Sequence, residues 1–326
     1  MKKLTIGIDV SKDKLDYCIL DNLTHEVVDR GIVDNNSQSI KQFIKDLDSN
    51  NTVLSFEHTG HYGALLAWIL SEEKLSFYMI NPLEIKRSMG IQRGKTDAID
   101  AFRIASFTIR NNDRLKPFKL PTEKLRKLKA LMTARDRYTK ISVQLKNSLK
   151  ANELLNKTVN LSELIEQEQK QIESIKEAIQ EVEKQMQEVI KSEADLKKTF
   201  DKITSVIGVG PITAIKCIVE TENFLKFTNG RKFSCHSGLA PFPYSSGSSI
   251  KGKTKTHHLR DKSLKAILFK AAGSAIQHDP QLKRYYNRKI EEGKVKLCVL
   301  NAVANKLVLR IFAVAKREQP YVKLTA

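Results

Sequence analysis

The chain is poor in cysteine, and its cysteines are not spaced as metal ligands. Four occur in 326 residues, at Cys18, Cys217, Cys235 and Cys298, with no pair close enough for a zinc finger. This usage is typical of a protein in the reducing cytoplasm and predicts no zinc site. No uninterrupted apolar run of 18 residues occurs, and no leader-like segment precedes the first predicted strand. We therefore expect a soluble, cytoplasmic protein without a membrane partner.

Acidic residues are scarce in the last third of the chain. Residues 201–326 carry 8 acidic and 23 basic side chains, whereas residues 1–110 carry 15 and 14 and residues 111–200 carry 14 and 19. The formal net charge is +19. A basic interaction tail would explain this excess, but apolar periodicity in the last third favours a folded domain. This uneven distribution of charge predicts that the protein acts on a polyanion, which one part of the chain holds and another part processes.

Four carboxylates lie where predicted elements begin or end: Asp9, Glu57, Asp97 and Asp100. Asp9 follows the apolar run 4–8, in which Gly7 allows a close approach, and Glu57 follows the run 52–56. Asp97 and Asp100 share one face at the start of a helix. Each alone is explained as a cap or turn residue. Together they predict a Mg²⁺ phosphotransfer site, because hard divalent ions prefer several carboxylate oxygens.

The first 112 residues alternate between strand and helix patterns. Strands are predicted at 3–10, 15–21, 26–33, 52–57 and 75–80, and helices at about 37–49, 62–73, 82–89 and 97–111. The first three strands form an antiparallel meander, and the later alternation predicts an α/β domain with a mixed sheet. This order of elements resembles the ribonuclease-H or RuvC-like fold. Fold alone does not fix the reaction.

Within the second part, residues 122–200 contain almost no strand signal. A basic helix is predicted at about 122–152, followed by a coiled-coil heptad that runs from Ile165 to Leu196. Dimerisation and packing against the preceding helix both explain the heptad. The basic helix predicts a nucleic-acid groove, and a solvated face explains it equally well. Its bases are Arg126, Lys127, Lys129, Arg135, Arg137, Lys140, Lys146 and Lys150.

Residues 201–326 form a third, mainly helical part with two notable segments. Gly208 and Gly210 lie in a helix–hairpin–helix pattern whose backbone N–H groups can meet a phosphate, although packing alone explains such a turn. The serine-rich segment 244–253 reads either as a flexible basic linker or as a nucleophilic serine with bases nearby. Those bases are Lys251, Lys253, Lys255 and Arg260. Amphipathic helices are predicted at about 260–277 and 294–317.

The motifs together resemble the DEDD transposases of bacterial insertion sequences, the bridge-RNA-guided recombinases. They are the segments 7–12, Glu57 with 59–62, 95–101, 207–210, 238–241 and 244–249, in the family's order over nearly the whole chain. The resemblance implies a RuvC-like domain (1–112), a basic helix and coiled coil (113–200) and a transposase domain (201–326). It implies that Asp9, Glu57, Asp97 and Asp100 hold Mg²⁺ and that Ser246 is the nucleophile, with Ser245 as the neighbouring alternative. Lys12 in the first motif is a candidate nucleic-acid contact.

The resemblance also implies partners and a covalent mechanism. A phosphoserine–DNA intermediate would preserve bond energy for strand exchange. The acids and the serine would meet in a composite site from different subunits of a dimer or tetramer. A noncoding guide RNA would pair with double-stranded target and element-end DNA. Without the resemblance, two other functions fit the residues: a junction-resolving nuclease that uses metal-activated water, and a non-catalytic nucleic-acid scaffold.

Overall fold

The computed structural model describes most of the chain. The described residues are 3–45, 47–48, 50–58, 60–88, 90, 96–246 and 250–322, without the side chains of Tyr244, Ile250, Lys251 and Lys253. Contacts divide the chain into two compact units, Met1–Leu120 and Pro121–Ala326. The division into three parts at residues 112 and 200 stays a prediction.

The first unit contains one five-stranded sheet in the order β3-β2-β1-β4-β5. β1 and β2 are antiparallel, as are β2 and β3, whereas β4 runs parallel to both β1 and β5. This mixed topology confirms the ribonuclease-H-like prediction. The elements are β1 (Leu4–Val10), β2 (Lys14–Asp21), β3 (Val27–Asp34), α1 (Ser37–Lys45), β4 (Thr52–Glu57), α2 (Ala64–Glu72), β5 (Phe77–Ile80), α3 (Pro82–Ser88) and α4 (Asp97–Arg110).

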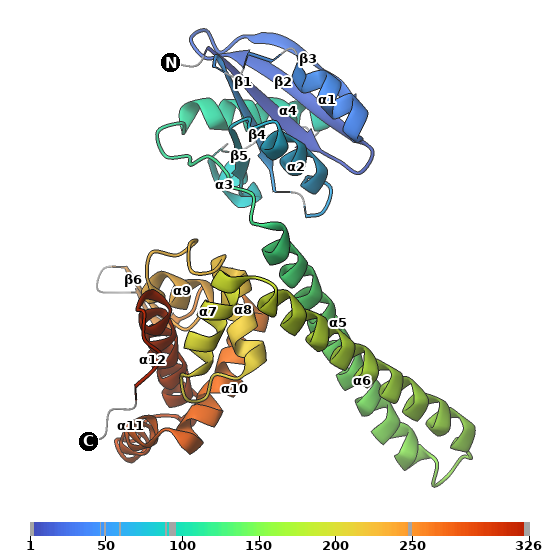
Figure 1. Cartoon of the computed structure of the whole chain (residues 1–326), viewed down its shortest axis with the longest axis vertical. Helices are drawn as coiled ribbons and strands as arrows, with labels where there is room; N and C mark the ends of the chain where they lie inside the picture. The colour runs from blue at the N-terminus through green and yellow to red at the C-terminus, as the bar shows by residue number, and fades with distance from the viewer. Residues whose placement is uncertain are drawn as a thin grey trace. The chain divides into compact units, whose positions relative to one another are not determined.

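Helices cover both faces of this sheet (Figure 1). On β1, Ile6 and Ile8 point to the face where α1 and α2 pack and form the main core of the unit. Successive strand residues face opposite sides, so Gly7 and Asp9 point to the other face, under α4. Cys18 and Leu20 of β2 pack there against Ala101 and Ala105 of α4. The face under α4 is therefore the face that carries the predicted acids of β1 and β4.

Gly7 explains how closely α4 approaches the sheet. A Cβ atom at this position would lie 2.3 Å from both the Ala101 carbonyl oxygen and the Ala105 backbone nitrogen. Helix and strand backbones are thus in direct contact, as the glycine in the first apolar run predicts. The Thr108 hydroxyl on α4 also donates to the Ser55 hydroxyl on β4, at 2.8 Å. These contacts fix the position of the α4 N-terminus relative to the ends of β1 and β4.

We expect Gly7→Ala to lower both stability and activity. The added methyl must push α4 away from β1, at a cost of about 1–3 kcal/mol in unfolding free energy. Because Asp97 and Asp100 begin α4, the shift also moves them relative to Asp9. Thermal unfolding measures the first effect, and an assay of the phosphotransfer activity predicted from the acids measures the second. Gly273→Ala is the matched control, because its Cβ would meet nothing within 4 Å; equal behaviour of the two variants would contradict this explanation.

The second unit begins with two long helices, α5 (Glu123–Leu155) and α6 (Ser162–Lys191), which lie side by side as an antiparallel hairpin (Figure 1). Arg135 Nε on α5 lies 2.6 Å from Glu183 Oε1 on α6, and the Ser148 hydroxyl donates to Glu168 at 2.6 Å. The predicted heptad thus packs against the preceding helix of its own chain. It does not run on to Leu196, because α6 ends at Lys191 and Leu196 belongs to α7. A supercoiled seam stays a prediction.

The remaining helices surround one apolar core. They are α7 (Ala194–Thr204), α8 (Pro211–Thr221), α9 (Gly230–His236), α10 (Lys262–His278), α11 (Pro280–Glu291) and α12 (Lys296–Lys316). The sequence patterns missed α11, whose start is marked by the N-cap Asp279 and by Pro280 at its first position. Buried residues of α8, α10 and α12, such as Ile215, Leu268 and Val308, form the core.

The sequence predicts an amphipathic helix at about 294–317, and α12 is more apolar than that prediction. Among the described helices it alone is long and apolar enough to cross a membrane, by length and composition. The apolar residues of one side, including Val303, Leu307 and Ile311, are fully buried in the core of the second unit. Core helices of soluble proteins pass the same test. The buried side of α12 therefore accounts for part of its apolar composition.

The serine-rich segment is not only a linker. Strands β6 (Phe242–Ser246) and β7 (Ile250–Lys255) pair antiparallel as a small separate sheet, with Ser245 opposite Lys251 and Ser246 opposite Ile250. The hairpin leaves the helical core after α9 and returns to it before α10. Ser246 is thus held at the end of a strand.

Candidate active site

The four predicted acids lie together in the first unit. Asp9 is near the end of β1, directly opposite Asp16 of β2. Glu57 ends β4, one residue beyond the pairing of Ile8 with Phe56. Asp97 and Asp100 occupy the first turn of α4, where the Thr96 side chain caps the helix by accepting from the Ile99 N–H. The residues before Thr96, including Lys95 of the motif, lie outside the described residues, as does Thr59.

The electrostatics of Asp9 show how close these acids are. Partial burial raises the pKa of Asp9 most, and the negative charges of Asp100, Asp97, Glu57 and Asp16 raise it further, to about 6. A carboxyl with an ordinary pKa near 3.8 thus resists ionisation because it is partly buried and because four other carboxylates lie near it. A bound cation would reduce the repulsion among these carboxylates. A carboxyl group whose pKa is raised in this way is typical of functional sites.

Two basic side chains partly balance the acids. Lys14 Nζ, on β2, lies 2.9 Å from Asp97 Oδ2 and 3.0 Å from Asp16 Oδ2. Its hydrogen bond to Asp97 and then that to Asp16 raise the pKa of the Lys14 ammonium. Arg103 Nη1 lies 2.7 Å from Asp100 Oδ1 one turn along α4. Lys14 therefore links the second strand to the N-terminus of α4 within the acid site.

Asp16 and Lys14 were missed by the sequence analysis. Asp16 is only 5% exposed and faces the same side of β2 as the buried Cys18 and Leu20. The sequence did contain a signal: Asp16 falls on the same face of the predicted strand as apolar residues. An aspartate in such a position is rarely buried without a partner. Asp16 therefore belongs to the acid cluster, although its own ion pair with Lys14 gives it a structural reason to be there.

The donor set fits a hard divalent cation. Five carboxylates lie together, and the printed pairs of Lys14 and Arg103 reach three of them, Asp16, Asp97 and Asp100. Carboxylate oxygens are the ligands that Mg²⁺ and similar ions prefer. Asp9, Glu57, Asp97 and Asp100 would hold such an ion, with Asp16 beside Asp9. Its charge would lower the pKa of Asp9 and neutralise a bound phosphate.

We expect divalent-cation affinity to depend on the ionisation of Asp9. Metal ligands must be deprotonated, so affinity should rise with pH up to about 6 and then level off. Below pH 6 the fall should approach tenfold per pH unit for one competing proton. Calorimetric titration with Mg²⁺ or Mn²⁺ between pH 5 and 8 measures this. An affinity that does not change over this range would contradict the assignment of Asp9 as a ligand.

The predicted nucleophile lies in the second unit. Ser245 and Ser246 are consecutive residues of β6 and both are exposed, so their hydroxyls point to opposite faces of the hairpin. This difference separates the two candidates, because a single bound phosphate can meet only one face. Residues 247–249 of the same motif lie outside the described residues. So do the side chains of Lys251 and Lys253.

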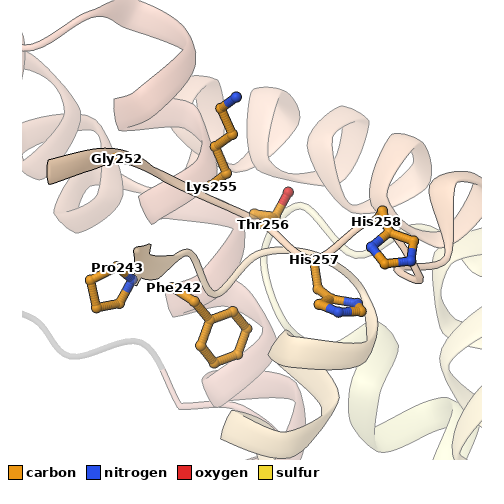
Figure 2. Close-up of a pocket in the computed structure, with 7 residues that line it drawn as sticks. All are labelled: Phe242, Pro243, Gly252, Lys255, Thr256, His257 and His258. Carbon is orange, nitrogen blue, oxygen red and sulfur yellow. The ribbon is translucent and has the colours of Figure 1, made fainter. Parts of the chain in front are cut away.

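A cavity of about 430 Å³ lies at the base of the serine hairpin. Figure 2 shows the rings of Phe242 and His257 directed to the same side, while the Lys255 side chain extends the other way. The His257 and His258 rings lie 4.4 Å apart. The Leu259 N–H donates to His257 Nδ1 at 3.2 Å, which makes Nδ1 the acceptor nitrogen of that ring. Aromatic rings and a nearby ammonium are suited to nucleic acid.

Both ends of the serine hairpin are fastened by a polar cluster. The Asp261 N–H donates to the His236 carbonyl at 3.0 Å, which ties the start of α10 to the end of α9. The side chains of Glu220, His236 and Asp261 offer ligand atoms within 4.8 Å of one another. Lys216 Nζ lies 3.4 Å from Glu220 and 3.2 Å from Asp136. The charge of Glu220 is therefore already balanced by an ammonium group of the protein. We read the cluster as structural.

Lys216→Met should destabilise the second unit. Burial alone would lower the pKa of the Lys216 ammonium, but Asp136, Glu220 and Asp261 outweigh it and raise the pKa. Removing this charge takes the ammonium partner away from both Asp136 and Glu220, at a cost of about 3 kcal/mol. Thermal unfolding measures the loss. Lys226→Met removes the ammonium of an exposed pair with Glu222 and should cost less than about 1 kcal/mol. Equal losses would show that burial does not matter here.

The other predicted nucleic-acid contacts differ in how available they are. Lys12, Arg126, Lys129 and Lys255 are exposed. Arg135 is engaged by Glu183, and Arg260 folds back, with its Nη1 donating to the His257 carbonyl at 3.2 Å. Those two side chains have intramolecular roles that the sequence did not show.

The two glycines of the helix–hairpin–helix pattern also differ. Gly208 has φ +91°, and a Cβ there would lie 2.6 Å from Ala275 Cβ and 2.8 Å from the Ala271 carbonyl on α10. Packing therefore explains Gly208. Gly210, the N-cap of α8, is exposed and has open space around it. A phosphate contact at this turn stays a prediction, and Gly210 is the residue with room for it.

A ribonuclease-H-like domain with clustered acids, followed by a basic helical unit, defines a class of nucleic-acid phosphotransfer enzymes. Comparison with known families narrows the class. A DEDD transposase model of the IS110 type matches residues 6–160, and the model described as the transposase IS116/IS110/IS902 family matches residues 201–287. The first match contains all four acids and the second contains the serine hairpin. The chain belongs to the IS110 family of DEDD transposases and is a DNA recombinase.

Relatives of full length are similar to the chain from end to end. The pilin gene-inverting proteins of Moraxella lacunata and Moraxella bovis are each 26% identical over 340 residues, which covers 99% of this chain and 99% of theirs. An uncharacterised 43.6 kDa protein of insertion element IS110 from Streptomyces coelicolor is 31% identical over 116 residues, covering 35% of this chain and 28% of that protein. The names of the two Moraxella relatives describe the inversion of a gene, and the name of the third describes a protein of an insertion element.

Among solved structures, Thermus thermophilus RuvC matches over 35% of this chain and 99% of its own. The TM-score is 0.26 at 13% identity for RuvC in complex with a Holliday junction substrate, and 0.25 at 14% identity for a second RuvC structure.

Proposed function

We propose that the chain cleaves and rejoins DNA strands of its insertion element and target through a covalent phosphoserine intermediate at Ser246. The observation that carries the proposal is the pairing, in one chain, of a carboxylate site with an exposed serine on a strand of the basic unit. A hydrolytic nuclease needs the acids but has no use for such a serine. Membership in a transposase family requires strand transfer, for which a covalent intermediate conserves the bond energy.

The chemistry divides between the two units. The four acids would hold Mg²⁺, which when bound would supply positive charge against the oxygens of the scissile phosphate. The Ser246 oxygen forms a bond to phosphorus as the bond to the leaving deoxyribose oxygen breaks, and that oxygen takes up a proton. The serine proton passes to a nearby base. Attack by a deoxyribose hydroxyl of another strand reverses these changes and releases Ser246, without added ATP.

The proposal extends to the partners. The substrates are double-stranded element ends and target, and a noncoding guide RNA pairs with both, so that base pairing selects the sites. The acids and the serine come from different subunits of a dimer, or of a tetramer when the DNA ends are joined. The phosphodiester backbone of the nucleic acid is contacted by Lys12, Arg126, Lys129 and Lys255. The protein acts in the cytoplasm.

The test is the formation of a DNA–protein adduct. Labelled DNA that carries an element end is incubated with the protein, with and without Mg²⁺ and the RNA transcribed beside the gene, and resolved under denaturing conditions. We expect a denaturant-resistant adduct that requires both additions. Cleavage without any adduct would favour the alternative, a junction-resolving nuclease that uses water. Binding without cleavage under all conditions would favour a scaffold.

A further inference from the structure

A cationic cavity lies in the second unit, and the proposed function does not use its lining residues. A cavity of about 790 Å³ opens between α11 and α12 and is lined by Arg284, Tyr285, Arg288, Lys306 and Arg310. Gln281, Leu282 and Leu309 complete its walls. Four of these eight side chains are cationic and none is acidic. A concave surface of this kind attracts anions.

The charges of this cavity are only partly neutralised. Arg310 is held by Asp279, whose carboxylate is 3% exposed and lies 2.6 Å from Arg310 Nη1. Arg288 has Glu292 at 3.8 Å. Arg284 and Lys306 are exposed and have no acidic partner among the described residues. At least two positive charges are therefore available to a ligand, on opposite walls formed by α11 and α12.

Tyr285 positions the two flexible cations. Lys306 Nζ lies 4.5 Å from the centre of its ring, and the Arg288 guanidinium carbon lies 5.8 Å from it. Attraction to an aromatic face restricts long side chains that would otherwise be disordered. Arg310 is likewise fixed by Asp279 and Gln281. The site is thus built before a ligand arrives, with one guanidinium fixed by hydrogen bonds and two cations held near one ring.

We propose that this cavity binds the phosphodiester backbone of a nucleic acid. Guanidinium and ammonium groups on two facing helices suit the phosphates of a nucleic-acid backbone, and contacts to phosphates position a nucleic acid without reading its sequence. The inference rests on the proposed function only in taking nucleic acid as the ligand. It assigns an anchoring surface, distinct from the acid site and from the serine hairpin.

The experiment measures binding rather than strand cleavage. Full-length protein carrying Ser246→Ala, which is expected to bind but not cut, is titrated against a labelled 30-base-pair DNA duplex and an RNA hairpin from 50 to 300 mM KCl. The test variant adds Arg284→Ala and Lys306→Ala. The control adds Lys184→Ala and Lys191→Ala, two exposed lysines of α6. Thermal unfolding confirms that both variants are folded.

We expect the test variant to bind on the order of tenfold more weakly at 0.1 M salt for each lost phosphate contact. The slope of log affinity against log salt should shrink by about 0.9 per contact on duplex DNA. Loss on one nucleic acid alone identifies which one occupies the cavity. Tyr285→Ala should reproduce part of the loss and Tyr285→Phe should restore binding, because only the ring is needed. Affinity and salt slope equal to those of the control, on both nucleic acids, would overturn the proposal.

A failure here is distinguishable from a failure of the proposed function. If the cavity variants bind normally while the protein with Ser246 intact forms its adduct, the anchoring surface is refuted and the mechanism stands. If the adduct never forms but the cavity variants lose affinity, the anchoring surface stands and the mechanism is refuted.

Discussion

Asp9→Asn should lower DNA cleavage by about a thousandfold, which corresponds to about 4 kcal/mol of transition-state stabilisation. Asp9 is the acid that all the others surround, and its carboxylate would be a central metal ligand. The substitution replaces an anionic ligand with a neutral one of the same shape. Nucleic-acid binding should persist, because the basic side chains of both units are unchanged. Cleavage assays and binding titrations measure the two properties separately.

The same substitution should stabilise the metal-free protein. The pKa of Asp9 is about 6 when folded and 3.8 ordinarily, so its ionised form opposes folding above pH 6 and this penalty fades as the pH falls toward 4. Asn removes the penalty, and the melting temperature at pH 7.5 without divalent ions should rise. Asp13→Asn, an exposed neighbour, is the control and should change neither property. Activity unaffected by Asp9→Asn would refute every enzymatic role assigned to the acids.

Ser246→Ala should abolish the covalent adduct and reduce strand cleavage by more than about a thousandfold, since loss of a nucleophile cannot be compensated by binding alone. Metal affinity at the acid site should not change, because Ser246 belongs to the other unit. Denaturing gels with labelled DNA measure adduct and product together. Undiminished cleavage would favour the water-using nuclease.

Ser245→Ala is the control for this result. Ser245 shares the strand, the exposure and the sequence context of Ser246 but faces the other side of the hairpin. It should retain at least about a third of the activity. If instead Ser245→Ala is inactive and Ser246→Ala is active, the covalent mechanism survives with the nucleophile reassigned.

Much of the first unit could be predicted from local patterns. Apolar runs that end in Asp9 and Glu57 predict strands that carry these acids, and Gly7 predicts a close approach by another element, which the structure identifies as α4. Lys14 and Asp16 could not be placed in the same way. Their role depends on which strand is paired with β1 and on how α4 crosses it, and neither is a local property of the sequence.

The second unit was harder to predict for a physical reason. Its serine segment is rich in glycine and lysine, so composition favours a linker, whereas pairing between β6 and β7 makes it a hairpin. Gly208 looks like a phosphate-binding glycine, but the contact that requires it comes from α10, more than sixty residues later. The cavity of α11 and α12 depends equally on distant elements. The serine hairpin, the role of Gly208 and this cavity all depend on contacts between residues that are far apart in the sequence.

The most direct test of the central claim is to identify the residue that becomes joined to DNA. Adduct formed with Mg²⁺ is digested with protease and nuclease, and the remaining nucleotide-linked peptide is sequenced by mass spectrometry. The account predicts a phosphodiester on Ser246, formed only with divalent metal and lost in Asp9→Asn. Efficient strand cleavage with no modified peptide, or with the nucleotide on a residue outside the serine hairpin, would contradict it.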